Sequence, residues 1–172
     1  ILFATGSRPY VPPEIEGTEV EGVFALRTLA DARKMAARVE KTEHAVMLGG
    51  GLLNLKAAFA LLERGVKVTL VVFSPEVLSQ LMEPEDARLI RRALDRAGLS
   101  IKTGAAATAV IAGDDGAGAV ALDDGVRLHF FDELQGLDLL LPIPIGDDRD
   151  RHHGIAGDQY LVLLDQHADI IC

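Results

Sequence analysis

The sequence predicts an α/β domain of three layers, in which a parallel sheet made of βαβ units is combined with an antiparallel β-meander. Two observations lead to this prediction. Between residues 44 and 104, apolar runs of strand length alternate with segments whose apolar residues recur at helical spacing. After residue 104 the helical spacing stops, and short apolar runs are separated by GDDGAG and DDG, which are strong hairpin-turn signals.

The N-terminal part predicts a connector followed by a helix. Residues 8–27 contain three prolines and two glycines, a composition that disfavours helix and sheet and suits an extended segment on a surface. Thr28 then offers an N-cap, with Asp31 three residues later in a variant of the capping box. We expect a helix from there to about Glu40.

The central part predicts two consecutive strand-helix units. The run AVML, three glycines, an apolar helix over residues 52–64 and the run VKVTLVVF form one βαβ unit. A second helix follows, with Pro84 at its first position and Gly98 past its end, and leads to the strand SIKTG.

The C-terminal part predicts the meander and two further strands. The runs ATAVIA, GAVAL and VRLHFF are the strands of the meander. The run LDLLLPIPIG is typical of a buried strand ended by prolines, and QYLVLLD predicts a final strand.

Length and charge indicate one domain that binds small molecules. A chain of 172 residues buries about two thirds of its unfolded surface. The formal net charge of −9 argues against nucleic acid or an anionic membrane as a partner, and no apolar run is long enough to span a bilayer. The single cysteine, Cys172, permits no redox pair and fits a reducing compartment, so we expect a soluble, cytoplasmic protein.

The stretch LGGGLLNLKAA predicts a phosphate-binding turn of a Rossmann-like domain. A strand that runs into Gly49, Gly50 and Gly51 and then into a helix lets main-chain N–H groups approach a pyrophosphate. The helix N-terminus adds partial positive charge. The alternative is that these glycines serve only a tight turn and close helix packing.

Three residues depart from the usual dinucleotide pattern. Asn54 stands where a third glycine is usual, so the helix must sit away from the sheet or the amide must find a polar partner. Lys56 places a cation near the helix N-terminus, either to meet a bound phosphate or as a solvated residue. Val72 occupies the strand-end position where an acid would bind the adenosine ribose.

The residues after Val72 do not identify the cofactor. No Arg or Lys lies between Phe73 and Gln80, and Glu76 would repel a 2′-phosphate. Ser74 is able to donate a hydrogen bond to the ribose of NADH or NADPH. Further along, Arg88, Arg91 and Arg92 are capable of binding anions, although a solvated helix face is their ordinary explanation.

Several segments together resemble one family. ATGSRPYVPPEIEG, GVFALRTLADA, AVMLGGGLLNLKAAFALLERGVKVTLV, IKTG and the terminal ADIIC are similar to segments of the FAD-dependent pyridine nucleotide-disulfide oxidoreductases. The resemblance is strong to about residue 104. It implies that residues 1–27 are a connector from a missing FAD domain and that residues 28–172 are the NAD(P)-binding domain, cut from a larger flavoprotein.

The resemblance also implies a site and a role. The nicotinamide nucleotide would lie along Gly49, Gly50, Gly51, Leu52 and Leu53. Phe73 would lie near the adenosine and Gly146 near the nicotinamide. In the full-length enzyme NAD(P)H would pass a hydride to FAD, whereas the isolated chain would be inactive because the flavin pocket is absent. The partners would be the dinucleotide, the FAD domain and, in a homodimer, a second copy. The alternative is a degenerate module with a structural, dimerisation or regulatory role.

Other polar clusters predict no catalytic or metal site. His152 and His153 are adjacent, and neighbouring residues rarely point at one ion, so a solvated loop is the better interpretation. The GDDRD segment lacks the spacing of a calcium loop and is typical of an exposed acidic turn. His129 has no nucleophile motif beside it, which predicts a core or surface histidine.

Overall fold

The computed structural model describes residues 1–6, 8–114, 116–130 and 161–164. Its elements, in chain order, are β1 (Val23–Ala25), α1 (Leu29–Val39), β2 (His44–Leu48), α2 (Leu52–Leu62), β3 (Lys67–Val72), α3 (Pro84–Arg96), β4 (Ser100–Thr103), β5 (Ala107–Gly113), β6 (Gly116–Leu122), β7 (Arg127–His129) and β8 (Leu161–Leu164).

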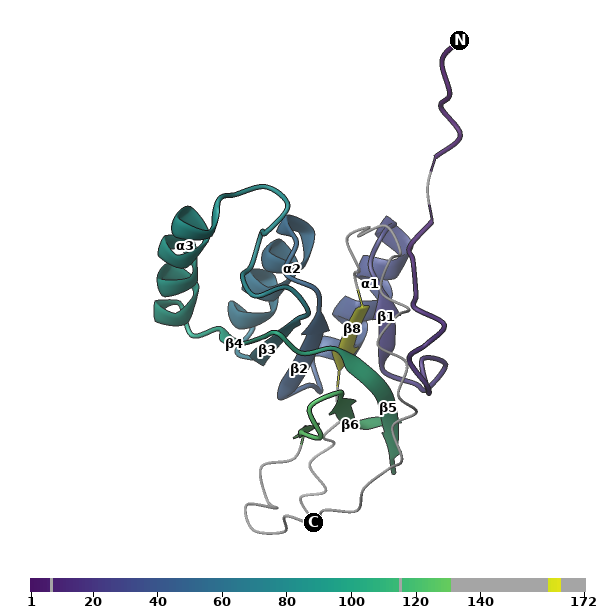
Figure 1. The fold of residues 1–172 in the computed structure, drawn as a ribbon. Helices are drawn as coiled ribbons and strands as arrows, with labels where there is room; N and C mark the ends of the chain where they lie inside the picture. The colour runs from purple at the N-terminus through teal and green to yellow at the C-terminus, as the bar shows by residue number, and fades with distance from the viewer. Residues whose placement is uncertain (7, 115, 131–160, 165–172) are drawn as a thin grey trace.

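Two sheets organise these strands. The larger sheet has the order β1-β8-β2-β3-β4, and the smaller has the order β5-β6-β7. Strands β2, β3 and β4 are parallel, as expected from two βαβ units. Strand β8 runs antiparallel to both of its neighbours and joins β1 to β2 (Figure 1). The smaller sheet is an antiparallel meander.

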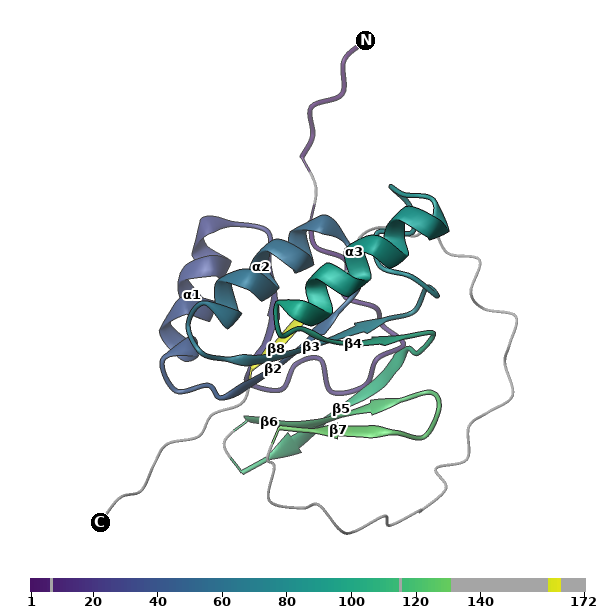
Figure 2. The same cartoon turned by 90° about the vertical axis from the view of Figure 1, so that its left-hand side faces the viewer.

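The fold has three layers. The three helices cover one face of the five-stranded sheet, and the meander lies against the opposite face (Figure 2). Alternate residues of β2 enter two different cores: Met47 packs in the core under the helices, while Val46 and Leu48 pack in the core against the meander. This period of two is that of a strand buried on both faces. The predicted fold class is therefore confirmed.

Local sequence signals account for the start of α1. The Thr28 side chain accepts a hydrogen bond from the Asp31 N–H at 3.2 Å, and the Asp31 carboxylate accepts from the Thr28 N–H at 2.8 Å. Both halves of the predicted capping box are thus present. Hydrogen bonds from the backbone and hydroxyl of Thr28 lower the pKa of Asp31 below its usual value.

Residues 8–27 pack against both sheets, which the expected surface connector would not do. Ile15 is buried in the core against the meander, and Glu16 forms a bridge with Ala109. Strand β1 pairs with β8 at the edge of the large sheet. The prolines end at residue 13, so Val23–Ala25 is free to pair as a strand. The expected division at residue 27 stays a prediction.

Two other expectations have different outcomes. The predicted final strand is confirmed as β8. The predicted strand LDLLLPIPIG lies outside the described residues. Among the helices of the described ranges, none is long and apolar enough to cross a bilayer.

Candidate functional site

The parallel strands bring most of the predicted site residues to one edge of the large sheet. Leu48 pairs with Val71, and Val72 pairs with Thr103, so β2, β3 and β4 end side by side. The glycine turn, which we define as Gly49, Gly50 and Gly51, follows β2 at this edge, and Phe73 and Ser74 follow β3. In open α/β sheets, the carboxyl ends of the strands are where ligands bind.

The glycine turn needs glycine at two of its three positions. Gly49 has a φ of 105°, in the left-handed region that favours glycine, and its N–H donates to the Val71 carbonyl at 2.8 Å. A Cβ on Gly50 would lie 2.8 Å from Val72 Cγ1 and 3.3 Å from Val77 Cα. Gly51 has a φ of −78°, which any residue adopts. The turn therefore has a packing reason for its glycines, whatever it binds.

The segment after β3 folds back onto the glycine turn. The Leu78 N–H donates to the Gly50 carbonyl at 3.0 Å, and Leu78 itself is buried with a φ of 54°. A non-glycine residue in this region is strained, and such strain persists only where the surroundings hold it. This contact fixes the orientation of the peptide bond between Gly50 and Gly51. No sequence signal predicted it, because leucine disfavours the left-handed region.

Helix α2 begins without compensation for the positive end of its dipole. Gly51 is the N-cap and makes no side-chain cap hydrogen bond, and the first turn of α2 contains no acid. The other two helices differ: α1 is capped by Thr28, and α3 carries Glu85 and Asp86 in its first turn. The first N–H groups of any helix have no intrahelical partner. The amides of Leu52 and Leu53 at the start of α2 are therefore suited to an external anion.

Asn54 stabilises the glycine turn by hydrogen bonds from the interior of the protein. Its side chain is 1% exposed, and Nδ2 donates to the Leu48 carbonyl at 2.6 Å and to the Gly49 carbonyl at 2.9 Å. The expectation that its amide finds polar partners is thus confirmed. The C=O and N–H of one trans peptide point in opposite directions. Since the Gly49 carbonyl points at Asn54, the Gly50 N–H points away from it.

The other predicted site residues, Lys56, Phe73 and Ser74, differ in exposure. Lys56 is exposed on α2, and none of the ion pairs in the described ranges uses it. The Phe73 side chain is 59% exposed at the end of β3, and Ser74 is half-buried. An exposed aromatic ring and a hydroxyl at this edge are chemically suited to a base and a sugar. Gly146 lies outside the described residues.

The strand-end position contributes no polar group. Val72 is 3% exposed and packs against Gly50, so an apolar contact stands where an acid would bind a ribose. Two residues beyond Ser74, however, Glu76 forms an ion pair with Arg88 of α3, with 3.4 Å between Oε1 and Nε. The Arg88 guanidinium, from a helix that follows later in the chain, thus meets the segment after β3. Residues 73–80 themselves contain no Arg or Lys, so the local sequence gives no sign of this cation.

Arg91 departs from the expected solvated arginine face on α3, whereas Arg88 and Arg92 are exposed as expected. Its Nη2 donates to the Ile101 carbonyl at 2.7 Å, and its Nη1 donates to Thr103 Oγ1 at 3.3 Å. These bonds attach α3 to β4, so Arg91 has a structural role. Its spacing of three from Arg88 was the sequence signal that both residues share a helix face.

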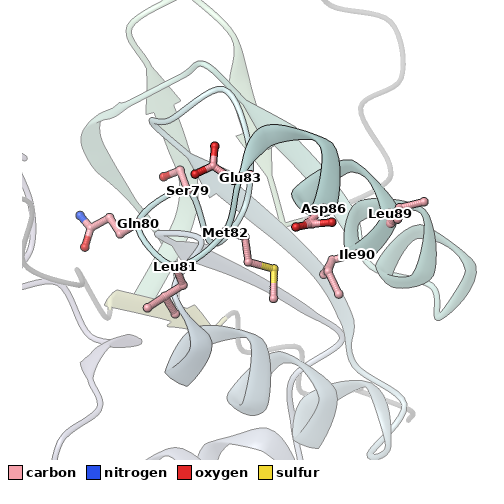
Figure 3. Close-up of a pocket in the computed structure, with 8 residues that line it drawn as sticks. All are labelled: Ser79, Gln80, Leu81, Met82, Glu83, Asp86, Leu89 and Ile90. Atoms are coloured by element: carbon pink, nitrogen blue, oxygen red, sulfur yellow. The ribbon is translucent and has the colours of Figure 1, made fainter.

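A nearby hollow of about 560 Å³ has the wrong charge for a diphosphate. It lies between the turn after β3 and α3. Figure 3 shows that Met82 and Ile90 extend into the same space, with the Asp86 carboxylate beside them. Glu83 adds a second carboxylate to the lining. Two acids would repel a dinucleotide, so the glycine turn is the better site.

Metal ligation has no support in the part of the chain that the structure describes. There, no group of three or more His, Cys, Asp or Glu side chains is placed to hold an ion. His129 is exposed at the end of β7, which agrees with one of its two predicted positions, the surface. The predicted acidic turn with Asp147, Asp148 and Asp150, and the pair His152 and His153, lie outside the described residues.

Comparison with known proteins finds relatives of this chain among enzymes named for NAD(P)H or NADH and among ferredoxin reductases. The large subunit of the NAD(P)H nitrite reductase of Klebsiella oxytoca is 35% identical over 116 residues, which are 67% of this chain and 12% of that protein. An NADH oxidase of Methanocaldococcus jannaschii is 32% identical over 103 residues, 59% of this chain and 23% of that protein. A crystal structure of a ferredoxin reductase from Rhodopseudomonas palustris matches with a TM-score of 0.70 and 28% identity, over 73% of this chain and 31% of that one.

The chain spans less than a third of the length of each of these relatives. The family profile described as pyridine nucleotide-disulphide oxidoreductase matches residues 1–133. This match covers most of the sequence, including the glycine turn and the strands on both sides of it. The chain therefore belongs to the pyridine nucleotide-disulphide oxidoreductase family.

Proposed function

We propose that this chain binds NAD(P)H at the glycine turn and, in a full-length flavoprotein, presents the nicotinamide to FAD for hydride transfer. The observation that supports this most is the start of α2. Among the helices of the described residues, it is the one whose N-terminus has neither a side-chain cap nor a first-turn acid, and it begins at the carboxyl edge of the parallel strands. A diphosphate supplies the negative charge that this end lacks.

The residues present fit such a ligand. The amides at Gly50, Gly51, Leu52 and Leu53 would bind the diphosphate, and the exposed Lys56 ammonium would add a charge on the same helix. Phe73 would contact the adenine, and Ser74 would donate to the adenosine ribose. The position of Gly146 near the nicotinamide rests on the family resemblance alone.

The redox chemistry would belong to the cofactors. NAD(P)H supplies a hydride and FAD accepts it, while this chain positions the dinucleotide and orients it by main-chain contacts. Two relatives named for NAD(P)H or NADH support the choice of cofactor. The expected partners are an FAD domain of the same protein and, in a homodimer, a second copy. We expect residues 28–172 to form the unit that binds the dinucleotide.

A second candidate is a module that has lost nucleotide binding and keeps a structural, dimerisation or regulatory role. The burial of Val72 against Gly50 favours it, because the apolar strand end offers nothing to the ribose. A charge-assisted hydrogen bond there is worth about 1.5–3 kcal/mol. Against this alternative, the amides at the start of α2 remain suited to an anion.

A titration of the chain with NADH and NADPH tests the proposal. At 100 times its dissociation constant, a ligand that binds only the native state adds about 2.7 kcal/mol of stability, which a thermal-shift assay detects. Millimolar NADH and NADPH that both leave the melting temperature unchanged would contradict the proposal and favour the second candidate.

The variant Gly51→Asp sharpens this test. An aspartate at the N-cap supplies the missing cap, and the φ of −78° at this position accepts any residue. We expect the ligand-free variant to be as stable as the wild type or more stable, by about a few tenths of a kcal/mol, yet unable to bind either dinucleotide because its carboxylate occupies the place of the diphosphate. Retained binding in this variant would place the ligand elsewhere.

A further inference from the structure

We propose that the Glu76–Arg88 ion pair sets the preference between NADH and NADPH, with Arg88 binding the 2′-phosphate and Glu76 competing for the same guanidinium. This inference rests on the proposed function and deepens it. It concerns the adenosine end of the site, where the sequence offers neither the acid expected for NADH nor a neighbouring cation for NADPH.

The pair joins α3 to the segment that follows β3, the strand at whose end the adenosine would bind. Glu76 follows Ser74 by two residues, in the segment that folds back onto the glycine turn through Leu78. Arg88 reaches it from α3, with 3.4 Å between Arg88 Nε and Glu76 Oε1. One acid and one base thus meet beside the strand end whose own residue, Val72, is apolar and buried.

The exposures of the two side chains suit an exchange of partners. The Glu76 side chain is 21% exposed and that of Arg88 is 64% exposed, so most of the Arg88 side chain meets solvent. Exposed ion pairs of this kind are weak and are held in competition with water and salt. A dianionic phosphate matches the planar fork of arginine with two parallel hydrogen bonds, and therefore competes well for Arg88.

Arg91, three residues further along α3, is less available for this role. Arg91 donates to Ile101 and Thr103 and has Asp95 within 3.7 Å, so its guanidinium is committed to β4 and to its own helix. In the wild type, the charges of Glu76 and Arg88 cancel each other. A substitution that removes one of these charges leaves the other uncompensated and should change the ratio of the NADPH and NADH affinities.

The experiment measures dissociation constants of the 172-residue chain for NADH and NADPH by nicotinamide fluorescence, for the wild type and four variants. Glu76→Gln frees Arg88 and should raise the NADPH-to-NADH affinity ratio about threefold. Arg88→Gln removes the fork and should lower this ratio about tenfold. Arg88→Lys keeps the charge without the fork and should give an intermediate ratio.

Arg64→Gln is the matched control. It removes the same charge, but Arg64 lies beyond the C-terminal end of α2, where its Nη1 donates to the Ala60 carbonyl. Its affinity ratio should equal that of the wild type. Equal ratios for Arg88→Gln and Arg64→Gln, with both nucleotides bound, would overturn the role of Arg88 and leave the proposed function intact. Absence of saturable binding of either nucleotide to the folded wild type would overturn both.

Discussion

Substitution of Asn54 tests how much its two hydrogen bonds to the glycine turn contribute to the stability of the fold. The side chain is 1% exposed and donates to two main-chain carbonyls, at 2.6 and 2.9 Å. Asn54→Leu keeps the number and branching of the side-chain heavy atoms but leaves both carbonyls without this donor. A buried polar group that loses its partner costs about 1–3 kcal/mol, and two carbonyls lose theirs, so we expect a loss of roughly 2–6 kcal/mol in the free energy of unfolding.

Asn54→Asp separates the hydrogen bonds from the packing. The new carboxylate has the same shape but accepts only, and it would face two carbonyl oxygens in a buried position. Burial raises its pKa above the unfolded value, so the variant keeps most stability at low pH, where a neutral carboxyl donates one hydrogen bond. As pH rises through the unfolded value and beyond, that stability is lost.

Urea unfolding at pH 4 and at pH 7 measures both effects. We expect Asn54→Asp to be the less stable of the two variants at pH 7 and to recover relative to the wild type at pH 4. Asn54→Gly, which restores the residue usual in the family, should destabilise as well, because it loses both bonds and adds a helical glycine worth about 1 kcal/mol. A pH-independent Asn54→Asp variant as stable as the wild type would refute the reasoning.

Three further predictions concern the turn, its neighbouring cation and the acid limb of stability. Gly50→Ala should lower the free energy of unfolding in urea by about 1–3 kcal/mol, because its Cβ would lie 2.8 Å from Val72 Cγ1. Val72→Ala in the same chain should restore part of this loss. An unchanged free energy of unfolding for Gly50→Ala would show that the turn has room for a side chain. Lys56→Gln should weaken NAD(P)H binding several-fold and reduce its salt dependence, whereas an unchanged affinity would mean that Lys56 is a solvated residue. The pKa of Asp31 is lowered by its hydrogen bonds with Thr28, and that of Asp124 by its hydrogen bond with Lys102. Their stabilisation is present above the usual carboxyl value of 3.8 and is lost as pH falls through the lower folded values, so Asp31→Asn and Asp124→Asn should flatten the decrease of the melting temperature below pH 4; parallel curves would contradict this.

Local signals predicted the elements well where periodicity and capping agree. The box at Thr28, Pro84 at the first position of α3 and the glycines between β2 and α2 all appear as expected. Each depends on residues within a few positions of one another, so tertiary packing has little scope to override it. The three layers followed from the change of period near residue 104.

Long-range contacts were beyond the sequence. The Glu76–Arg88 pair depends on where α3 crosses the strand ends, which no spacing along the chain specifies. The placement of β8 between β1 and β2 is likewise a choice among several sheet orders that the same runs allow. For the candidate site, the turn was predictable from its glycines. The partners of Asn54 were not, because they depend on where the turn places the Leu48 and Gly49 carbonyls.

The position of β8 has a consequence for how the protein is made. Val23–Ala25 and His44–Leu48 meet in the large sheet through residues 161–164, which leave the ribosome long after both of them. Until then, the nascent polypeptide carries two unsatisfied strand edges, which are prone to pair with other molecules. Closing this gap is a non-local step of the kind that slows folding. Premature termination before residue 161 should therefore yield an aggregation-prone product rather than a shorter native one.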